Sequence, residues 1–229
     1  MNTNSNVYTI IYASVMVVIV AFVLAFVSHS LSDIQKSNED FDKMKQILTA
    51  LDLDASGEDD VAAFYNKFVK ADQIINSNGE VISEDGGFTV EVKAELAKDL
   101  ADRQLPLYVC EVEGETKYVL PLYGAGLWGA LWGYVALDDD KDTVYGVYFA
   151  HAGETPGLGA EISMPRFQKQ FDNKKLMKDG AIALSVVKNG HVHDQNHEVD
   201  GLSGGTITSN GVDAMLKLCL SQYDTFLKN

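Results

Sequence analysis

Cysteine is scarce in this chain: only Cys110 and Cys219 occur among its 229 residues. Two cysteines so far apart form neither a zinc site nor a C-x-x-C redox pair. Cys110 ends the apolar run Leu105–Cys110, and Cys219 falls on the apolar side of a C-terminal helical pattern. We expect two buried small side chains, and a disulfide is the alternative.

Basic residues are also few, with 18 Lys and Arg against 33 Asp and Glu, so the formal net charge is −15. Recognition of nucleic acid needs a basic face, and this balance excludes it. An acidic, solvated surface is expected instead. The segment from Asp52 begins like an EF-hand loop, but Asp59 and Ala63 stand where that loop needs an apolar residue and a glutamate.

Other signatures are missing. No G-x-G-x-x-G occurs in a β-α-β setting, so no dinucleotide site is predicted. His191, His193 and His197 follow an Asn-Gly turn and indicate a polar loop, with a metal site as the weaker interpretation. There is neither an internal repeat nor a low-complexity linker, which predicts one soluble domain.

Charge is absent from one long stretch, Val7–Val27, which is almost entirely apolar. Twenty-one residues at about 1.5 Å each make a helix of about 32 Å, enough to span a bilayer core. A cleaved signal peptide is the alternative, but no basic residue precedes the run and the run is long for one. We expect a retained single-pass anchor in residues 1–30.

The charge pattern alone does not decide on which side of the membrane the large domain lies. No lysine or arginine precedes the span, whereas Lys36, Lys43 and Lys45 follow it. Taken literally, the positive-inside rule places the large domain in the cytoplasm. Interspersed acidic residues weaken that bias.

The remaining chain, residues 31–229, predicts an α+β domain: a twisted antiparallel sheet flanked by helices and covered on one side. Its expected helices are Ile34–Leu53, Asp60–Val69, Glu91–Leu100 and one near the C-terminus. Its expected strands are Gln73–Ile75, Glu80–Ile82, Leu105–Cys110, Tyr118–Leu122, Tyr134–Leu137, Val144–Ala150 and Ala181–Lys188.

The most informative segment is D-G-L-S-G-G-T-I-T-S, residues 200–209. Adjacent glycines leave the backbone free to curl, and an amphipathic helical pattern follows directly. A glycine-rich turn that enters a helix N-terminus favours a bound phosphate. A simple Ser/Gly helix cap is the plainer alternative.

The same residues also fit G-x-S-x-G, the nucleophile elbow of hydrolases, around Ser203. That elbow needs a buried strand before the serine and a histidine after it. No buried strand is expected over residues 194–200, and no histidine follows Ser203. A hydrolase is therefore not favoured.

Two further segments are suited to a flat ligand. Residues 154–162, E-T-P-G-L-G-A-E-I, form a Pro/Gly loop in which Gly157 and Gly159 permit close backbone approach. Residues 124–133, G-A-G-L-W-G-A-L-W-G, place Trp128 among small residues. The plainer interpretations are a rigid turn and a glycine-rich turn with core tryptophans.

Together, E-T-P-G-L-G, G-x-G-L-W and S-G-[AG]-T behind one anchor resemble the C subunits of the Na⁺-translocating NADH:quinone reductases over essentially the whole chain. The last motif resembles the flavinylation sequence D-x-x-S/T-G-A-T-x-S/T, with Gly205 where alanine is usual. The homologous G subunit of Rnf ferredoxin:NAD⁺ complexes shares the flavin motifs. A non-redox membrane-anchored domain that binds FMN or another ligand is the remaining alternative.

The resemblance implies FMN bound covalently through a phosphoester to Thr206. Ser203, Gly204 and Gly205 would shape the phosphate turn, and Lys188 would offset negative charge. The ring system would contact further residues, namely Glu154, Thr155, Leu158, Gly159 and Trp128.

The resemblance also implies partners and a place. The chain would be an electron carrier in a six-subunit complex that moves electrons from NADH toward ubiquinone or menaquinone and exports Na⁺. A separate flavin transferase that uses FAD would load it. The flavin domain would lie on the periplasmic side of the inner membrane, against the weak lysine bias.

Overall fold

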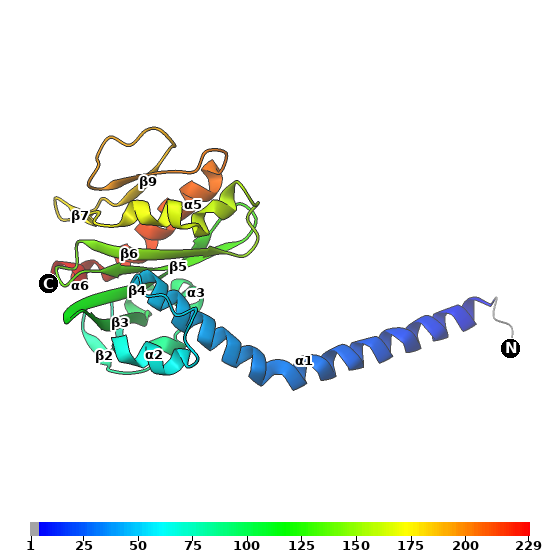
Figure 1. Cartoon of the computed structure of the whole chain (residues 1–229). Helices are drawn as coiled ribbons and strands as arrows, with labels where there is room; N and C mark the ends of the chain where they lie inside the picture. Colours follow the sequence, from blue (N-terminus) through cyan, green and yellow to red (C-terminus); the bar gives the residue numbers. More distant parts are fainter. Residues whose placement is uncertain (1–4) are drawn as a thin grey trace. The chain divides into compact units, whose positions relative to one another are not determined.

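The structure is a computed structural model that describes residues 5–229 (Figure 1). Residues 1–4, where the predicted anchor begins, lie outside the described residues. The chain forms two compact units, Met1–Lys43 and Met44–Asn229. The helix α1, Asn6–Ala50, contributes to both.

The first unit is helical over nearly all of its described part. Its apolar side chains, among them Val17, Phe22 and Leu24, are exposed. By length and composition, α1 is suited to cross a membrane. This agrees with the helical span expected over Val7–Val27 and with its continuation past Ile34.

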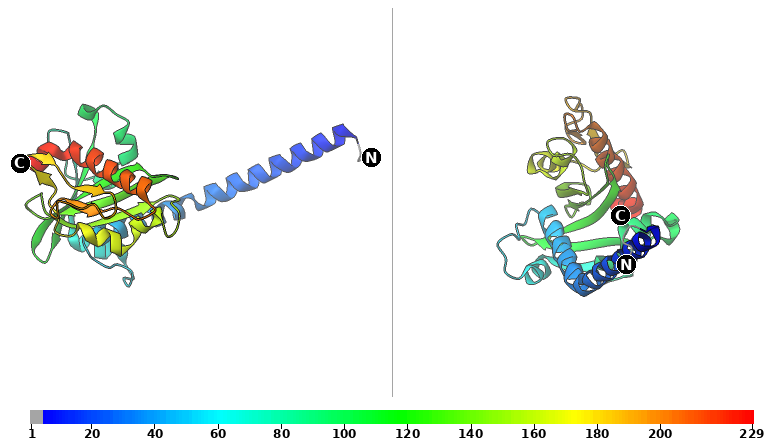
Figure 2. Two further views of the ribbon diagram at one scale, coloured as in Figure 1. Left: turned by 90° about the horizontal axis from the view of Figure 1, so that it is seen from above. Right: turned by 90° about the vertical axis from the view of Figure 1, so that its right-hand side faces the viewer.

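The second unit is built on a six-stranded antiparallel sheet in the order β2-β1-β3-β4-β5-β6 (Figures 1 and 2). The strands are β1 Val69–Ile75, β2 Val81–Ser83, β3 Leu105–Val112, β4 Glu115–Ala125, β5 Ala130–Leu137 and β6 Val144–His151. Each of the six strands that the sequence predicts between residues 73 and 150 overlaps a strand of this sheet. The α+β class is confirmed.

Helices and short strands complete the unit. The α-helices are α2 Val61–Phe68, α3 Val92–Leu96, α4 Pro165–Gln168, α5 Thr206–Leu220 and α6 Asp224–Lys228. The 3-10 turns are η1 Gly87–Thr89, η2 Leu100–Asp102, η3 Gly159–Ser163, η4 Lys169–Phe171 and η5 Ser221–Tyr223. Two small sheets pair β7 Met177–Lys178 with β8 Ala181–Ile182, and β9 Ser185–Val187 with β10 Glu198–Asp200.

The sheet buries both of its faces, whereas the sequence predicted cover on one side. One core contains Leu107, Phe149 and Leu216, and the other contains Ile47, Tyr108 and Ala136. Neighbouring residues such as Leu107 and Tyr108 point to opposite faces because strand side chains alternate. Both are buried, so α5 and the α4 region cover one face, and the end of α1 and α2 cover the other.

Three local predictions were wrong. Ala181–Lys188 is two short strands, because β8 pairs with β7 and β9 pairs with β10. The helix expected over Glu91–Leu100 stops at Leu96. A short strand, β10, does precede Ser203, and Val199 in it is buried in parallel pairing with Val186.

The cysteine prediction is confirmed within residues 5–229: Cys110 and Cys219 are both buried and both free. Burial raises the pKa of the Cys110 thiol to about 12 and that of Cys219 to about 11. Over the same residues, no group of His, Cys, Asp and Glu is arranged to hold a metal ion.

Candidate functional site

The start of α5 opens onto a small pocket of about 240 Å³. It is lined by residues from three loops, brought together from positions far apart in the sequence. They are Leu127, Glu154, Thr155, Leu158, Gly159, Gly204, Gly205, Thr206, Ile207 and Thr208. Most of the residues singled out in the sequence therefore meet around Thr206.

Thr206 is the first residue of α5 and its side chain is exposed. The preceding N-cap residue is Gly205, and in the described chain no side chain caps this helix end. The first helical turn leaves N–H groups without an i−4 carbonyl, and the helix dipole adds positive potential there. A hydroxyl at this position thus lies beside backbone groups suited to a phosphate.

Two glycines form the turn before Thr206. Gly204 has a φ of +77°, in the left-handed region that favours glycine. A Cβ at Gly204 would lie 2.8 Å from Leu158 Cδ2. Gly205 is buried with an ordinary φ of −110°, and a Cβ there would lie 3.0 Å from Leu202 Cβ. The turn and the Leu158 loop are therefore in close contact.

Glu154 holds the three loops together. Its carboxylate is buried and accepts hydrogen bonds from Thr208 Oγ1 at 2.5 Å and from the Trp128 backbone N–H at 2.8 Å. Burial by itself raises the pKa of this carboxyl. The hydrogen bonds from Thr208, Trp128 and Leu127 outweigh it, and the net effect lowers the pKa. Glu154 is therefore a charged anchor for the site.

Gly159 completes this arrangement. A Cβ at this position would lie 2.5 Å from Glu154 Oε2 and would also collide with Thr208 Oγ1. The turn is closed by the Thr155 carbonyl, which accepts hydrogen bonds from the N–H groups of Leu158 and Ala160. The predicted rigid Pro/Gly loop is thus explained by its contacts with α5.

Apolar side chains are exposed around this pocket. Leu127, Trp128, Leu158 and Ile207 are 48%, 69%, 43% and 57% exposed. Trp128 is therefore a surface residue rather than the core residue of the plainer interpretation. These side chains give the pocket an apolar rim that suits a flat aromatic ligand.

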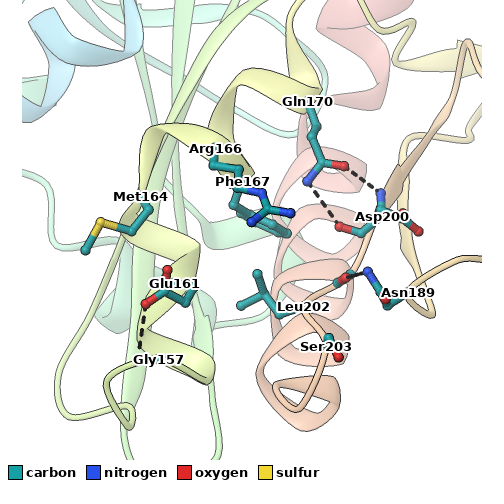
Figure 3. Close-up of a pocket in the computed structure, with 11 residues that line it drawn as sticks. Gly157, Glu161, Met164, Arg166, Phe167, Gln170, Asn189, Asp200, Leu202 and Ser203 are labelled. Carbon is teal, nitrogen blue, oxygen red and sulfur yellow. Dashed lines mark hydrogen bonds between the residues drawn. The ribbon is translucent and has the colours of Figure 1, made fainter.

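A second, larger pocket of about 620 Å³ lies between η3–α4 and the segment before α5 (Figure 3). It is lined by Gly157, Glu161, Met164, Arg166, Phe167, Gln170, Asn189, Asp200, Gly201, Leu202 and Ser203. Of the predicted residues, Ser203 lines this pocket instead of the smaller one. Lys188 lines neither; it is exposed, directly before Asn189.

Sequence reasoning missed Thr208, Arg166, Gln170 and Asn189. Thr208 had a signal, because it occupies the final hydroxyl position of the flavinylation-like motif. Arg166, Gln170 and Asn189 had none, because only the folded chain brings them to one pocket.

Comparison with known proteins assigns the class. A family model described as FMN-binding domain matches residues 126–221, which include the three loops and all of α5. Fold and site thus define an FMN-binding domain.

Similar chains identify the family within this class of FMN-binding domains. The C subunit of the Na⁺-translocating NADH-quinone reductase from Haemophilus ducreyi is 33% identical over 94% of this chain and 90% of its own. The same subunit from Pseudomonas aeruginosa is 30% identical over 100% and 97%. The chain belongs to the family of C subunits of the Na⁺-translocating NADH-quinone reductases, which are oxidoreductase complexes.

Solved structures agree with this assignment. The crystal structure of the C subunit from Parabacteroides distasonis has a TM-score of 0.79 at 45% identity and covers 87% of this chain and 98% of its own. NqrC from Shewanella oneidensis has a TM-score of 0.71 at 26% identity, with 83% and 97% covered.

Proposed function

We propose that this chain is the electron-carrying subunit of a Na⁺-translocating NADH:quinone reductase and carries FMN in phosphoester linkage to Thr206. The observation that carries the proposal is the position of Thr206. Its exposed side chain is at the uncapped start of α5, in the lining of the small pocket. FMN, when bound, supplies a ring system that accepts and gives up electrons.

The residues present fit such a group. The phosphate would lie at the first turn of α5, with Ser203, Gly204 and Gly205 shaping the turn. Gly204 and Gly159 make close approaches that a Cβ would block. Lys188 would offset negative charge from its exposed position just after β9.

The ring would contact the 154–159 loop. Leu158, which is 43% exposed, would lie against an aromatic face, and Thr155 and Gly159 would line the same side. Glu154 would hold the loop in place, and Trp128 would cover the ring from the neighbouring loop.

Loading would require a separate flavin transferase. In that step Thr206 Oγ would form a bond to the FMN phosphorus of FAD, the P–O–P bond would break, AMP would leave and the hydroxyl proton would be released. An exposed hydroxyl suits this reaction because a second protein must reach it.

We further propose that residues 1–30 anchor the chain in the inner membrane and that residues 31–229 form the FMN domain on the periplasmic side. Five other subunits would complete the complex, which moves electrons from NADH toward ubiquinone or menaquinone and exports Na⁺. The segment between Val7 and Val27 contains no Asp, Glu, Lys, Arg or His, so the Na⁺ path is assigned to other subunits.

The test is flavin fluorescence in a denaturing gel. The full chain, expressed with its flavin transferase, is compared with Thr206→Ala and Thr116→Ala. Thr116 is the matched control, because it is an exposed threonine that lines neither pocket. We expect fluorescence in the wild-type and Thr116→Ala bands and none in Thr206→Ala. A dark wild-type band would overturn the covalent linkage and favour a domain that binds free FMN or another ligand.

A further inference from the structure

The two arginines of this acidic chain have different surroundings. Arg103 is fully engaged: it donates to the carbonyls of Lys98 and Leu96 and to Gln222 Oε1. Arg166 forms no hydrogen bond or ion pair with any residue in the 5–229 range. Arg166 is exposed, so its guanidinium is available to pair with a ligand.

Arg166 lies on α4 and faces the larger pocket. Figure 3 shows its guanidinium pointing from α4 across the pocket toward the Asp200–Leu202 segment. Arg166 is the one lysine or arginine among the described residues that line this pocket. A volume of about 620 Å³ falls within the range of small-molecule sites, about 300–1,000 Å³, whereas the 240 Å³ beside Thr206 is smaller than that range.

The segment opposite Arg166 is held in place by hydrogen bonds. The side-chain amide of Gln170, in η4, accepts a hydrogen bond from the Asp200 N–H at 3.0 Å and donates one to the Asp200 C=O at 3.3 Å. Asn189 donates from Nδ2 to the Gly201 carbonyl at 2.9 Å. Asp200 accepts from the Gly190 N–H through Oδ1 at 2.7 Å. Within the described residues, Asn189 Oδ1 and Asp200 Oδ2 accept no hydrogen bond.

Apolar side chains complete the pocket. Phe167 is buried and lines the pocket, and Leu202 and Met164 also line it. The pocket therefore offers a planar donor on one side, acceptors on the other and apolar surfaces between them. This pattern matches a flat ring whose edge carries two carbonyl oxygens on either side of an N–H, which is the pyrimidinedione end of a flavin.

The two pockets are neighbours. Gly157 and Ser203 line the larger one, and the next residues, Leu158 and Gly204, line the smaller one. Leu158 and Gly204 are in close contact between them. The turn before Thr206 therefore borders both pockets, and a ligand attached to Thr206 would start beside both.

We infer that the larger pocket receives the pyrimidinedione end of the flavin and that Arg166 is the residue that positions it and favours its reduced form. This inference rests on the proposed function. A guanidinium stays charged and donates from a planar fork, so it suits a carbonyl edge on which negative charge accumulates during reduction.

The test separates covalent attachment of the flavin from the effect of Arg166 on the flavin's midpoint potential. Arg166→Gln, Arg166→Lys and Lys169→Gln are made in the full chain and expressed with the flavin transferase. Lys169 is the matched control, because it is an exposed cation in the adjoining turn η4 and lines neither pocket. In-gel fluorescence scores loading, and an equilibrium redox titration gives the midpoint potential.

We expect all variants to be loaded. The midpoint potential of Arg166→Gln should be more negative than that of wild type, Arg166→Lys should fall between them, and Lys169→Gln should match wild type. A loaded Arg166→Gln chain with the potential of Lys169→Gln would overturn the inference and leave the proposed function intact. A wild-type chain without covalent flavin would overturn both.

A second measurement does not depend on loading. In the Thr206→Ala background, which lacks the attachment hydroxyl, free riboflavin is titrated by fluorescence quenching. Adding Arg166→Gln should weaken binding by about tenfold, the equivalent of one charge-assisted hydrogen bond. Equal affinity with and without Arg166 would contradict the assignment, whatever happens in the loading experiment.

Discussion

The Glu154 carboxylate accepts a hydrogen bond of 2.5 Å from the hydroxyl of Thr208, 54 positions later in the chain. The other carboxylate oxygen of Glu154 accepts from the N–H of Trp128. One buried charge thus connects the loop after β6, the loop between β4 and β5 and the first turn of α5. The position of Thr206 depends on this connection, because Thr206 lies two residues before Thr208.

Glu154→Gln should lower the free energy of unfolding by about 1–3 kcal/mol at pH 7, because the new amide group turns an N–H donor toward groups that are themselves donors. Chemical denaturation of the flavin-free chain measures this. Unchanged stability would contradict the role of the buried carboxylate.

The loss in free energy of unfolding caused by Glu154→Gln should depend on pH. The pKa of Glu154 is lowered in the folded chain, so its stabilisation is fully present above the unfolded pKa, about 4.3, and is lost as pH falls through the folded value. The stability difference between wild type and Glu154→Gln should therefore shrink as the pH is lowered below about 4.3. A difference that stays constant from neutral pH to well below that value would count against this explanation.

Thr208→Val should mainly lower stability, whereas Thr206→Val should mainly abolish flavin attachment. Thr208 is buried, and its loss as a donor leaves Glu154 Oε2 unpaired, so the free energy of unfolding should fall by about 1–3 kcal/mol. Thr206 is exposed, so its replacement should change stability by about 0.5 kcal/mol or less and abolish flavin attachment. Thermal melts and gel fluorescence of both variants provide the comparison. Equal stability losses would contradict the assignment.

The two turn glycines should also differ. Gly204→Ala combines a positive φ with a contact of 2.8 Å to Leu158 Cδ2, so it should destabilise the chain by at least about 1 kcal/mol and reduce loading. Gly205→Ala keeps an ordinary φ and requires small shifts of Leu202 and of the Leu158 backbone, 3.0 Å and 3.3 Å from the new Cβ, so it should load normally. Loading measured after brief co-expression with the transferase distinguishes them, and normal loading of Gly204→Ala would contradict this view of the turn.

Both thiols should resist modification in the native state. Burial raises the pKa of Cys110 and Cys219 to about 12 and about 11, so few thiolates exist near neutral pH and neither sulfur is accessible. An aromatic disulfide reagent should label both cysteines only after denaturant is added. Rapid labelling of the folded chain at either position would show that its core opens.

Local patterns were sufficient for much of the fold. Between Leu105 and Ala150, apolar runs alternate with turn residues, so the positions of the four strands in this part of the sheet could be predicted. The start of the last helix near Thr206 could be predicted because two glycines precede an amphipathic pattern.

What failed depends on contacts between distant residues. The strands β8 and β9 divide Ala181–Lys188 because they pair with different partners, and no local signal in this apolar run marks the break. The cover on the second face escaped prediction because it comes from the end of α1, which the sequence presents as a continuation of the anchor. Arg166 lies in a four-residue helix that no sequence pattern marks as functional. Its proposed role becomes visible only when the folded chain places it in the lining of the larger pocket.

Covalent attachment at Thr206 is measured most directly by peptide mass spectrometry of the full chain, purified with its complex after expression with the flavin transferase. The peptide containing Thr206 should gain the mass of one FMN less one water, with fragment ions placing it on Thr206. An unmodified Thr206 peptide, or the same mass gain on Ser203 or Thr208, would contradict it.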